Sequence, residues 1–336
     1  MMDAEGIFRY YEKDLRRVED EIAKIFSSDV VVIPDIGRHL IGGGGKRLRP
    51  MYLLMSAALS GYSGDGRYVF AGVIETIHAA SLLHDDVVDG AGVRRGKPTS
   101  HSIWGTQVVI LVGDYLYANS LRMAVSQQNL KTMEAISYAV AKMSEGEILQ
   151  LQKIADPEIT EADYVRIVES KTGALISASC KIGAILGGLS EEKVNAMASY
   201  GLKSGTVFQI YDDILDFKAD EENLGKKLGR DLHEGKITLP LIYLLKSANA
   251  QERQELTTII DSTSDEDMPD KEKDGQIESD LKKVLRLFKK YDVIEKTMDK
   301  AKEIVAEAKA ELSAFDDCKE KDALIVMAEY ALSRDK

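Results

Sequence analysis

The chain has 336 residues, of which 44% are hydrophobic and 30% are charged, and this composition excludes a disordered or collagen-like chain. Its 56 acidic residues exceed its 44 basic residues and leave a net charge of −12, so the basic bias that nucleic-acid binding requires is absent. Cys180 and Cys318 are isolated from each other and from any ligand-spaced histidine, which excludes a disulfide framework or a zinc site. The N-terminal segment carries acidic residues and no apolar signal-peptide core, so we predict a cytoplasmic protein.

The hydrophobic pattern predicts an all-α fold. Apolar residues recur at i, i+3, i+4 and i+7 along nearly every long segment, whereas the alternation typical of strands is almost absent. The predicted helices cover residues 7–25, 51–59, 69–88, 107–125, 133–154, 162–186, 191–217, 238–248, 281–312 and 322–332. The connections are mostly short, which favours antiparallel neighbours in one bundle and a single domain over 1–336. No uncharged run reaches the roughly 18 residues that a membrane span needs.

Residues 261–280 form the one segment where the composition changes. They are acidic and polar, and they include one proline and one glycine. We predict a mobile, solvated surface loop between two late helices.

Thr160 and Asp163 mark the start of an earlier helix, because they have the spacing of a capping box.

Two acidic clusters of the form DDxxD interrupt otherwise apolar helical segments. The first aspartate cluster consists of Asp85, Asp86 and Asp89, and the second consists of Asp212, Asp213 and Asp216. The first and last acids of a cluster lie within about 40° on one helix face and about 5.4 Å apart along the axis. Like charges this close repel, so a cation must offset them, and ligands that are all carboxylate oxygens favour Mg²⁺ or Mn²⁺. A solvated helix face explains one such cluster as well, but not two of the same form in apolar surroundings.

Basic residues recur beside these clusters. They are Lys46, Arg47 and Arg49 after the glycine run 42–45, Arg94 and Arg95 after the first cluster, Lys171 in ESKTGAL, and Lys226, Lys227, Arg230 and Lys236 after the second cluster. The glycine run is not a P-loop, because Leu40 stands where that motif needs glycine and Arg47 where it needs Ser or Thr. Each cation alone is typical of a solvated surface. Together with two metal-binding clusters, they predict a site for two highly anionic substrates.

Five motifs in this order resemble those of the trans-polyprenyl diphosphate synthase family: GGKRLRP, LLHDDVVDGAGVRRGKPT, KTG, FQIYDDILDF and GRDLHEGKITLPL. The resemblance extends from Gly44 to Arg334. It implies an antiparallel helix bundle of the isoprenoid synthase type around a central cavity, usually in a homodimer, with the two aspartate clusters facing each other. The implied reaction condenses isopentenyl diphosphate with an allylic diphosphate such as farnesyl diphosphate, repeatedly, to give a long all-trans polyprenyl diphosphate for quinone side chains.

The resemblance also implies which residues bind metal ions. About three Mg²⁺ ions, by analogy with the family, would bridge the allylic diphosphate to Asp85, Asp89 and Asp212. The remaining cluster members would be further ligands or would orient metal-bound water; they are Asp86, Asp213 and Asp216.

The other implied roles concern the two diphosphates and the reacting carbon. The residues that would bind isopentenyl diphosphate are Lys46, Arg49, His78 and Arg95. The residues that would bind the allylic diphosphate are Arg94, Lys171, Lys226 and Lys236. The allylic C–O bond would ionise to a carbocation as charge develops on the leaving group, and Thr172 and Gln209 would stabilise that cation with their oxygen atoms. Released diphosphate would take the proton, and exclusion of water would protect the cation.

Product length is predicted from the helix before the first cluster. The growing chain is expected to run past Ile74, Ile77, Ala80 and Ser81, which precede Asp85 by 11, 8, 5 and 4 positions and are expected to share its helix face. Ala80 and Ser81 are small where family members that stop at 15 carbons carry aromatic rings.

The floor of the tunnel is therefore expected deeper, near Ile74, Met123 or Met143. Since one isoprene unit is about as long as one helix turn, we expect a product of about eight units, within a range of six to ten. Such a product would be delivered to a membrane.

Three alternatives remain at this stage. A geranylgeranyl diphosphate synthase of 20-carbon products would share every motif. A class I terpene cyclase carries one DDxxD and an NDxxSxxxE motif, which QIYDDILDF does not match. A non-catalytic subunit of a two-component synthase loses motif aspartates or basic residues, and both are intact here. Lys227 departs from the family, which often has proline there, and the apolar segment 107–125 is a candidate dimer interface.

Overall fold

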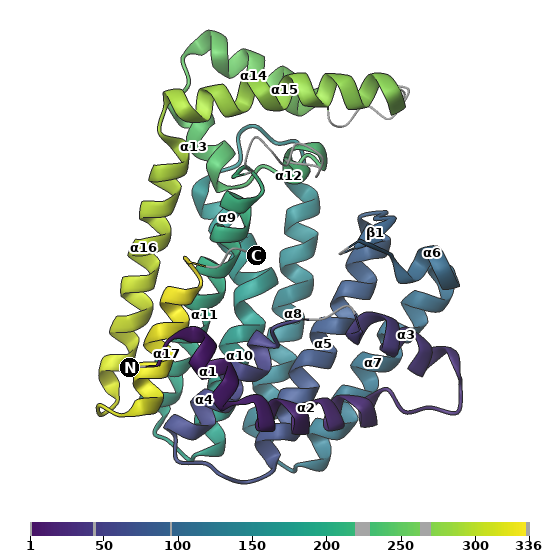
Figure 1. The fold of residues 1–336 in the computed structure, drawn as a ribbon, viewed down its shortest axis with the longest axis vertical. Coiled ribbons are helices and arrows are strands. Elements are labelled where there is room, and N and C mark those ends of the chain that lie inside the picture. The colour runs from purple at the N-terminus through teal and green to yellow at the C-terminus, as the bar shows by residue number, and fades with distance from the viewer. Residues whose placement is uncertain (1, 43–44, 95, 219–228, 263–269, 334–336) are drawn as a thin grey trace. The chain divides into compact units, whose positions relative to one another are not determined.

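The computed structural model describes residues 2–42, 45–94, 96–218, 229–262 and 270–333. Helices dominate this part of the chain (Figure 1). The strands it contains form one short antiparallel hairpin, β1 (Val93–Arg94) and β2 (Lys97–Pro98). The predicted all-α class is therefore confirmed.

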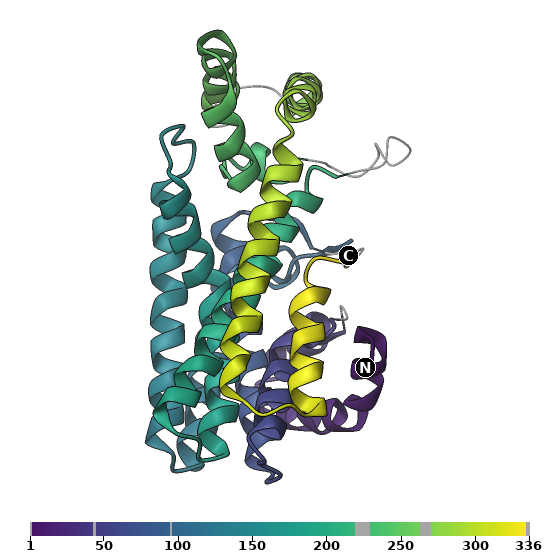
Figure 2. The same cartoon turned by 90° about the vertical axis from the view of Figure 1, so that its left-hand side faces the viewer.

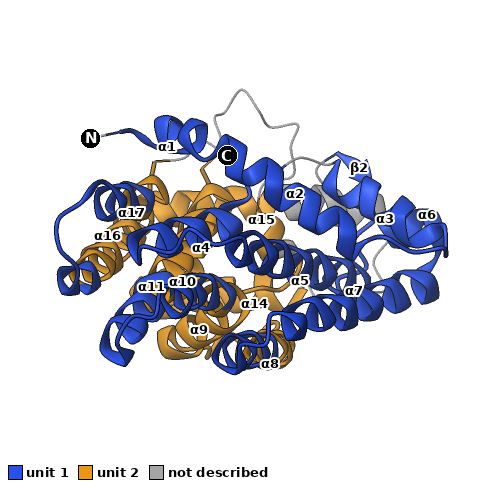
Figure 3. Cartoon of the chain, turned by 90° about the horizontal axis from the view of Figure 1, so that it is seen from below, with its two compact units in different colours: residues 1–141, 175–201, 311–327 blue, residues 142–174, 202–310, 328–336 orange. Residues whose placement is uncertain are grey.

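The chain divides into two compact units, each assembled from three separate stretches (Figure 3). The first unit contains 1–141, 175–201 and 311–327, and the second contains 142–174, 202–310 and 328–336. Helices α8 (Leu130–Gln152) and α11 (Glu191–Leu215) contribute residues to both units. Because neither unit is continuous in sequence, this division does not separate two sequential domains, and the single domain over 1–336 stays a prediction.

The first unit is built around α5 (Gly66–Val88). Its other helices are α1 (Ala4–Tyr10), α2 (Glu12–Ile25), α3 (Val32–Ile41), α4 (Leu48–Leu59), α6 (Ser100–Trp104), α7 (Thr106–Ser126), most of α10 (Ala174–Leu186) and most of α17 (Lys319–Tyr330). Helix α5 packs against α2, α4 and α7. Gly113 on α7 brings that helix close, because a Cβ there would lie 2.2 Å from the Nε2 atom of His84 on α5. The end of α5 that carries the first cluster is thus held tightly against α7.

The second unit holds the motifs of the second half of the chain. Its elements besides parts of α8 and α11 are α9 (Glu161–Val168), a π-helical turn η1 (Glu169–Gly173), α12 (Arg230–His233), α13 (Leu239–Ser247), α14 (Ala250–Ser262), α15 (Asp270–Lys290) and most of α16 (Val293–Glu311). The capping box predicted at Thr160 and Asp163 is present at the start of α9. Helix α13 packs against α9 and α15.

Several predicted boundaries are wrong. The segment 7–25 is broken at Tyr11 between α1 and α2, and α3 was not predicted, because Pro34 and Gly37 obscure its pattern. The segment 281–312 is two helices that meet at a bend, visible between α15 and α16 in Figures 1 and 2. Asp292 adopts a left-handed conformation there, with φ of 51°, which ends α15.

The predicted loop over 261–280 is also largely wrong. Helix α14 extends to Ser262 and α15 begins at Asp270, whereas 263–269 lies outside the described residues. The charged stretch DKEK is rich in good helix formers. It continues into an apolar face with Leu281 and Val284 buried, and this packing favours helix over loop.

Helix α7 is the one described helix whose length and composition would allow it to cross a membrane. Only 39% of its most apolar window is buried within the structure, and such a single helix is weak support for a membrane span. Its apolar side faces α5, where Val109, Val112 and Leu116 are buried. Leu111 and Val125 are 67% and 57% exposed, so the described residues leave part of its apolar surface uncovered.

The close packing of α10 on α4 gives a test of the first unit. A Cβ on Gly183 would lie 2.6 Å from the backbone nitrogen of Ala57 and 2.8 Å from the carbonyl oxygen of Leu53. We expect Gly183→Ala to lower the free energy of unfolding by about 1–3 kcal/mol, because backbone atoms cannot yield as a side chain can. Thermal and denaturant unfolding measure this loss. Gly92→Ala, where an added Cβ meets no atom within 4 Å, is the control, and an unchanged Gly183→Ala protein would contradict the packing.

Candidate active site

The first aspartate cluster lies at the C-terminal end of α5. Asp86 is 4% exposed, and its Oδ1 atom accepts a hydrogen bond of 2.6 Å from Nε of Arg94 on β1. Asp85 and Asp89 are half-buried and one turn apart, and the backbone nitrogen of Asp89 donates to the carbonyl oxygen of Asp85 at 2.8 Å. Arg94 therefore fixes the middle acid. The outer two have the spacing for shared cation binding.

His84 and Tyr117 lie beside this cluster. The Nε2 atom of His84 is 3.1 Å from the carbonyl oxygen of Ile110, and its ring packs on that of Tyr117. Burial, together with the charges of Asp85 and Asp114, raises the pKa of Tyr117 to about 12. His84, to which the sequence assigned no role, fastens α5 to α7 next to the first cluster.

The basic motif after the glycine run separates into two kinds of residue. Arg47 has a left-handed backbone, with φ of 50°, and its guanidinium binds Glu19 at 2.6 Å and Glu75 at 3.1 Å. Arg47 therefore links the start of α4 to α2 and α5. In the sequence, Arg47 stands between the two predicted ligands of this motif. Lys46 is exposed, and Arg49 is half-buried.

Glu75 is a largely buried acid beside the predicted ligand Arg49, and the sequence assigned it no role. Burial raises its pKa, while the charges of Arg49 and Arg47 act in the opposite direction. It lies one turn before the predicted ligand His78, which is half-buried on α5. An acid within the apolar segment 69–88 was the signal available in the sequence.

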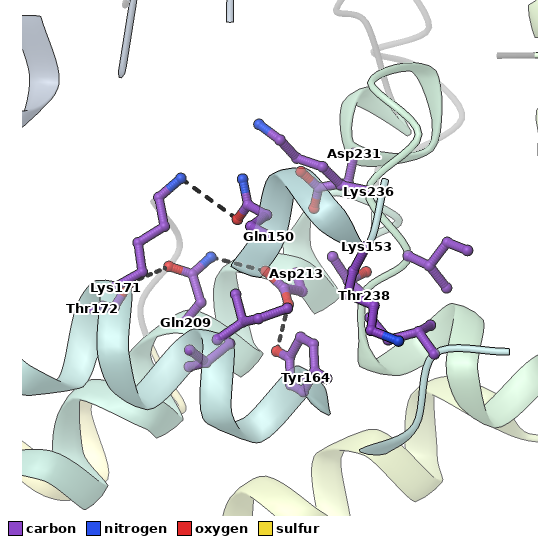
Figure 4. A pocket seen from close by; sticks show the side chains of 14 residues that line it. Gln150, Lys153, Tyr164, Lys171, Thr172, Gln209, Asp213, Asp231, Lys236 and Thr238 are labelled. Atoms are coloured by element: carbon purple, nitrogen blue, oxygen red, sulfur yellow. Dashed lines mark hydrogen bonds between the residues drawn. The ribbon is translucent and has the colours of Figure 1, made fainter. Parts of the chain in front are cut away.

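The second aspartate cluster lies near the C-terminal end of α11. Asp213 is 2% exposed, and both of its carboxylate oxygens accept hydrogen bonds. Its Oδ2 accepts from the hydroxyl of Tyr164 on α9 at 2.5 Å, and its Oδ1 accepts from Nε2 of Gln209 at 2.9 Å. The Oε1 atom of Gln209 accepts in turn from Oγ1 of Thr172 at 3.0 Å. This network, drawn in Figure 4, joins three predicted site residues and adds Tyr164, which the sequence did not single out.

Asp216 is held by the turn before α12. Its two carboxylate oxygens accept hydrogen bonds from the backbone nitrogens of Arg230 at 3.2 Å and Asp231 at 3.1 Å. Gly229 allows this turn by adopting a φ of 65°. Burial raises the pKa of Asp216 and, more strongly, that of Asp231. The negative charges of Asp213 and Asp216 raise the pKa of Asp231 further.

Lys171 and Thr172 lie in the π-helical turn η1, which re-aims their side chains relative to a regular helix. The Nζ atom of Lys171 is 2.5 Å from Oε2 of Glu147 and 3.5 Å from Oε1 of Gln150, both on α8. Gly146 permits this approach, because a Cβ there would lie 2.8 Å from the backbone nitrogen of Lys171.

A cavity of about 150 Å³ opens beside these groups. Its polar lining includes Lys171, Thr172, Gln209, Asp213 and Lys236 (Figure 4). All of these lining residues belong to the second unit. The structure therefore brings together Lys171 and Lys236, predicted to bind the allylic diphosphate, with Thr172 and Gln209, predicted to stabilise the cation. Arg94 is not among the lining residues, and Lys226 lies outside the described residues.

Three residues of the predicted site lie outside the described residues: Arg95, Lys226 and Lys227, the last being the departure from the family pattern. Their predicted roles stay predictions.

The residues predicted to set chain length are on α5. Ile74, Ile77 and Ala80 are fully buried, and Ser81 is half-buried. At 100° per residue, Ser81 lies about 40° from Asp85 around the helix, whereas Ala80 lies about 140° away. Ser81 is therefore better placed than Ala80 to meet a chain that starts at the first cluster.

The donor chemistry fits divalent cations. Burial is the main cause of the raised pKa values of Asp213 and Asp216 in the second cluster, so a bound cation would favour their charged forms. Among the described residues, no group of three or more His, Cys, Asp or Glu side chains forms a complete metal cage. Partial carboxylate sets suit Mg²⁺, which takes its remaining ligands from water and substrate phosphates.

Comparison with known proteins identifies the family. A sequence profile described as polyprenyl synthetase matches residues 30–274. The chain is 37% identical over 335 residues to the octaprenyl diphosphate synthase of Escherichia coli (strain K12), with 100% of both chains covered. The chain belongs to the polyprenyl synthetase family. It is a prenyltransferase of the trans-polyprenyl diphosphate synthase type, as the motifs predicted, and members of this family use divalent metal ions.

Solved structures agree with this assignment. The decaprenyl diphosphate synthase from Rhodobacter capsulatus superposes on the enzyme with a TM-score of 0.90 and 35% identity, covering 98% of each chain. A polyprenyl synthase from Caulobacter crescentus CB15, complexed with calcium and isoprenyl diphosphate, gives a TM-score of 0.88 and 35% identity, covering 98% of this chain and 97% of that one. The predicted isoprenoid synthase fold is confirmed.

The burial of Asp213 predicts a pH dependence of stability. Burial raises the pKa of Asp213 from 3.8 to about 7, despite the hydrogen bonds from Tyr164 and Gln209. Between these pH values the folded enzyme retains a proton that the unfolded chain releases, so its stability falls as the pH rises through this window. In EDTA, we expect Asp213→Asn to reduce the fall in melting temperature between pH 5 and pH 8 by roughly 3–8 °C.

The measurement is thermal unfolding at several pH values. Asp317→Asn, which changes an acid whose side chain is 98% exposed, is the control. Equal pH slopes for wild type and Asp213→Asn would contradict this assignment. Added Mg²⁺ should flatten the wild-type profile.

Proposed function

We propose that the enzyme condenses isopentenyl diphosphate with an allylic diphosphate, farnesyl diphosphate in the first instance, and repeats the reaction to build a long all-trans polyprenyl diphosphate. The observation that carries this proposal is the grouping of Lys171, Thr172, Gln209 and Lys236 around one cavity beside the second aspartate cluster. The octaprenyl and decaprenyl synthases among its relatives support a long-chain product.

The chain's own residues would perform the binding. Lys171 and Lys236 line the cavity and would donate hydrogen bonds to the allylic diphosphate, with Arg94 and Lys226 as further donors. Lys46, Arg49, His78 and Arg95 would bind isopentenyl diphosphate. Separate basic sets suit two separate anionic substrates.

The hydrogen-bond network orients the atoms that would face the allylic cation. The proton of the Thr172 hydroxyl is committed to Oε1 of Gln209, so the lone pairs of Thr172 Oγ1 remain available for developing positive charge. Gln209 is fixed by its second hydrogen bond, to Asp213. No side chain needs to act as a nucleophile, because the alkene of isopentenyl diphosphate attacks the cation and the released diphosphate accepts the proton.

The aspartate clusters would hold about three Mg²⁺ ions, by analogy with the family, at Asp85, Asp89 and Asp212. When bound, these ions would neutralise the charge that develops on the leaving diphosphate. Asp86, Asp213 and Asp216 already accept hydrogen bonds from the protein, so we assign them to orienting the other three acids and metal-bound water.

We further propose a cytoplasmic homodimer that delivers its product to a membrane. The exposed apolar residues of α7, Leu111 and Val125, are the surface that a second copy would cover.

The direct test uses purified enzyme, Mg²⁺, farnesyl diphosphate and labelled isopentenyl diphosphate, with dephosphorylated products resolved by length. We expect a ladder that ends near 40 carbons. Asp212→Asn should lower the turnover rate by about 10²–10³-fold, because it removes a group that stabilises the transition state electrostatically. Asp299→Asn, at a surface side chain that is 67% exposed, is the control.

The outcomes separate the alternatives. A stop at 20 carbons would retain the reaction and identify a geranylgeranyl diphosphate synthase. No incorporation by the folded wild type would favour the non-catalytic subunit and sink the proposal.

Chain length is tested on α5. We expect Ser81→Phe to shorten the final product to 15 or 20 carbons while sparing the first condensation, since a ring one turn before Asp85 would block the chain. Product length on the same substrates is the measurement. Ala80→Tyr tests the position turned away from Asp85, and an unchanged ladder for both variants would place the tunnel elsewhere.

A further inference from the structure

Two of the lysines that line the cavity, Lys171 and Lys236, are predicted to bind diphosphate, and each has a carboxylate partner supplied by the chain. Lys236 lies 2.8 Å from Oε2 of Glu234, whose Oε1 atom also accepts from Arg230 at 2.6 Å. Lys171 lies 2.5 Å from Oε2 of Glu147. The two carboxylates differ in the number of cations that they contact. Glu234 contacts both Lys236 and Arg230, whereas within the described structure Glu147 forms its ion pair with Lys171.

Glu147 differs from the acid of an ordinary surface salt bridge in that its carboxylate is buried. Both of its carboxylate oxygens are buried, and neither has a hydrogen bond of good geometry within the described structure. The ion pair with Lys171 is thus a charge contact between two largely buried side chains, 17% and 25% exposed. A buried carboxylate that lost its cation would be strongly destabilised, so Lys171 is retained at Glu147 while its remaining N–H groups serve the cavity.

The backbone fixes this arrangement. Glu147 follows Gly146, where α8 and η1 approach so closely that no Cβ fits between them. Lys171, in the π-helical turn, both lines the cavity and contacts Glu147, which is not among the lining residues. The close packing of α8 on η1 thus fixes the backbone positions from which Glu147 and Lys171 meet.

We propose that Glu147 is a positioning residue for Lys171 and that its charge weakens diphosphate binding enough for the cleaved diphosphate to leave after each condensation. The inference rests on the proposed function, in which every elongation cycle releases one diphosphate. Glu147 aims the ammonium at the substrate and repels the anion that the ammonium binds. Catalytic turnover and product release are thereby balanced by one carboxylate.

The experiment measures binding of inorganic diphosphate with Mg²⁺ by isothermal titration calorimetry. Neutralising Glu147 removes a repulsive charge a few ångströms behind the ligand, so we expect Glu147→Gln to lower the dissociation constant about three- to tenfold. In steady-state assays we expect its turnover number to fall while KM for the allylic substrate does not rise, because Lys171 is less well aimed. Glu147→Asp, which keeps the charge, should restore a dissociation constant close to that of wild type.

The matched control is Glu145→Gln on the same helix. Glu145 is 57% exposed and pairs with Lys142 at 2.6 Å, so its neutralisation should change neither binding nor turnover. Glu147→Met is made in parallel, since its apolar side chain of similar size introduces no buried amide that needs a hydrogen-bond partner, and thermal unfolding confirms that the variants fold. Either folded neutral variant suffices.

Unchanged or weaker diphosphate binding in a folded neutral variant would overturn the inference while leaving the proposed function intact, provided that the wild type incorporates isopentenyl diphosphate. Tighter binding in Glu145→Gln as well would also overturn it, because the effect would then reflect net charge alone. A wild type that neither binds diphosphate nor incorporates isopentenyl diphosphate would overturn both proposals.

Discussion

The structure depends on holding like charges close together inside a chain that is already strongly acidic. Each aspartate cluster solves this in the same way, by giving its middle acid protein donors. Asp86 is bound by Arg94, and Asp213 is bound by Tyr164 and Gln209. These bonds fix the helix positions from which the outer acids project. The middle acid of each DDxxD pattern thus has a supporting role, which Asp216 shares in the second cluster by accepting hydrogen bonds from the backbone of α12.

Close backbone packing provides the rigidity that this arrangement needs. Gly113 brings α7 against His84, and Gly146 brings α8 against η1. Gly146 lies against the predicted ligand Lys171, and Gly113 lies against His84, which precedes the predicted ligand Asp85 in the sequence. A carboxylate or ammonium displaced by one ångström loses much of its effect on a reacting group, so helix packing contributes directly to catalysis.

The sequence predicted most helices and the helical setting of the two aspartate clusters well, because both leave local signals. Period-3.6 patterns identify helices, and acids within apolar runs identify clusters. The sequence predicted poorly where the outcome depends on distant partners. Tyr164 has no distinguishing pattern until folding places its hydroxyl at Asp213, and Glu147 looks like an ordinary surface acid of an amphipathic helix. The helical start of α15 was missed for a related reason, since composition alone does not show the buried contacts of Leu281 that follow.

The two kinds of cation in the basic motifs illustrate why a motif alone does not assign roles. In GGKRLRP, Arg47 forms ion pairs with Glu19 and Glu75. This anchoring fixes the backbone from which Lys46 and Arg49 project. An isolated lysine or arginine at a diphosphate site would lose much side-chain conformational entropy when it binds the anion, since its long side chain must be ordered. Carboxylates that order the cations in advance reduce that cost but also compete with the substrate. A synthase that must release diphosphate at every cycle gains from both effects, because its cations are aimed before the substrate arrives and hold the product less tightly after the bond has broken.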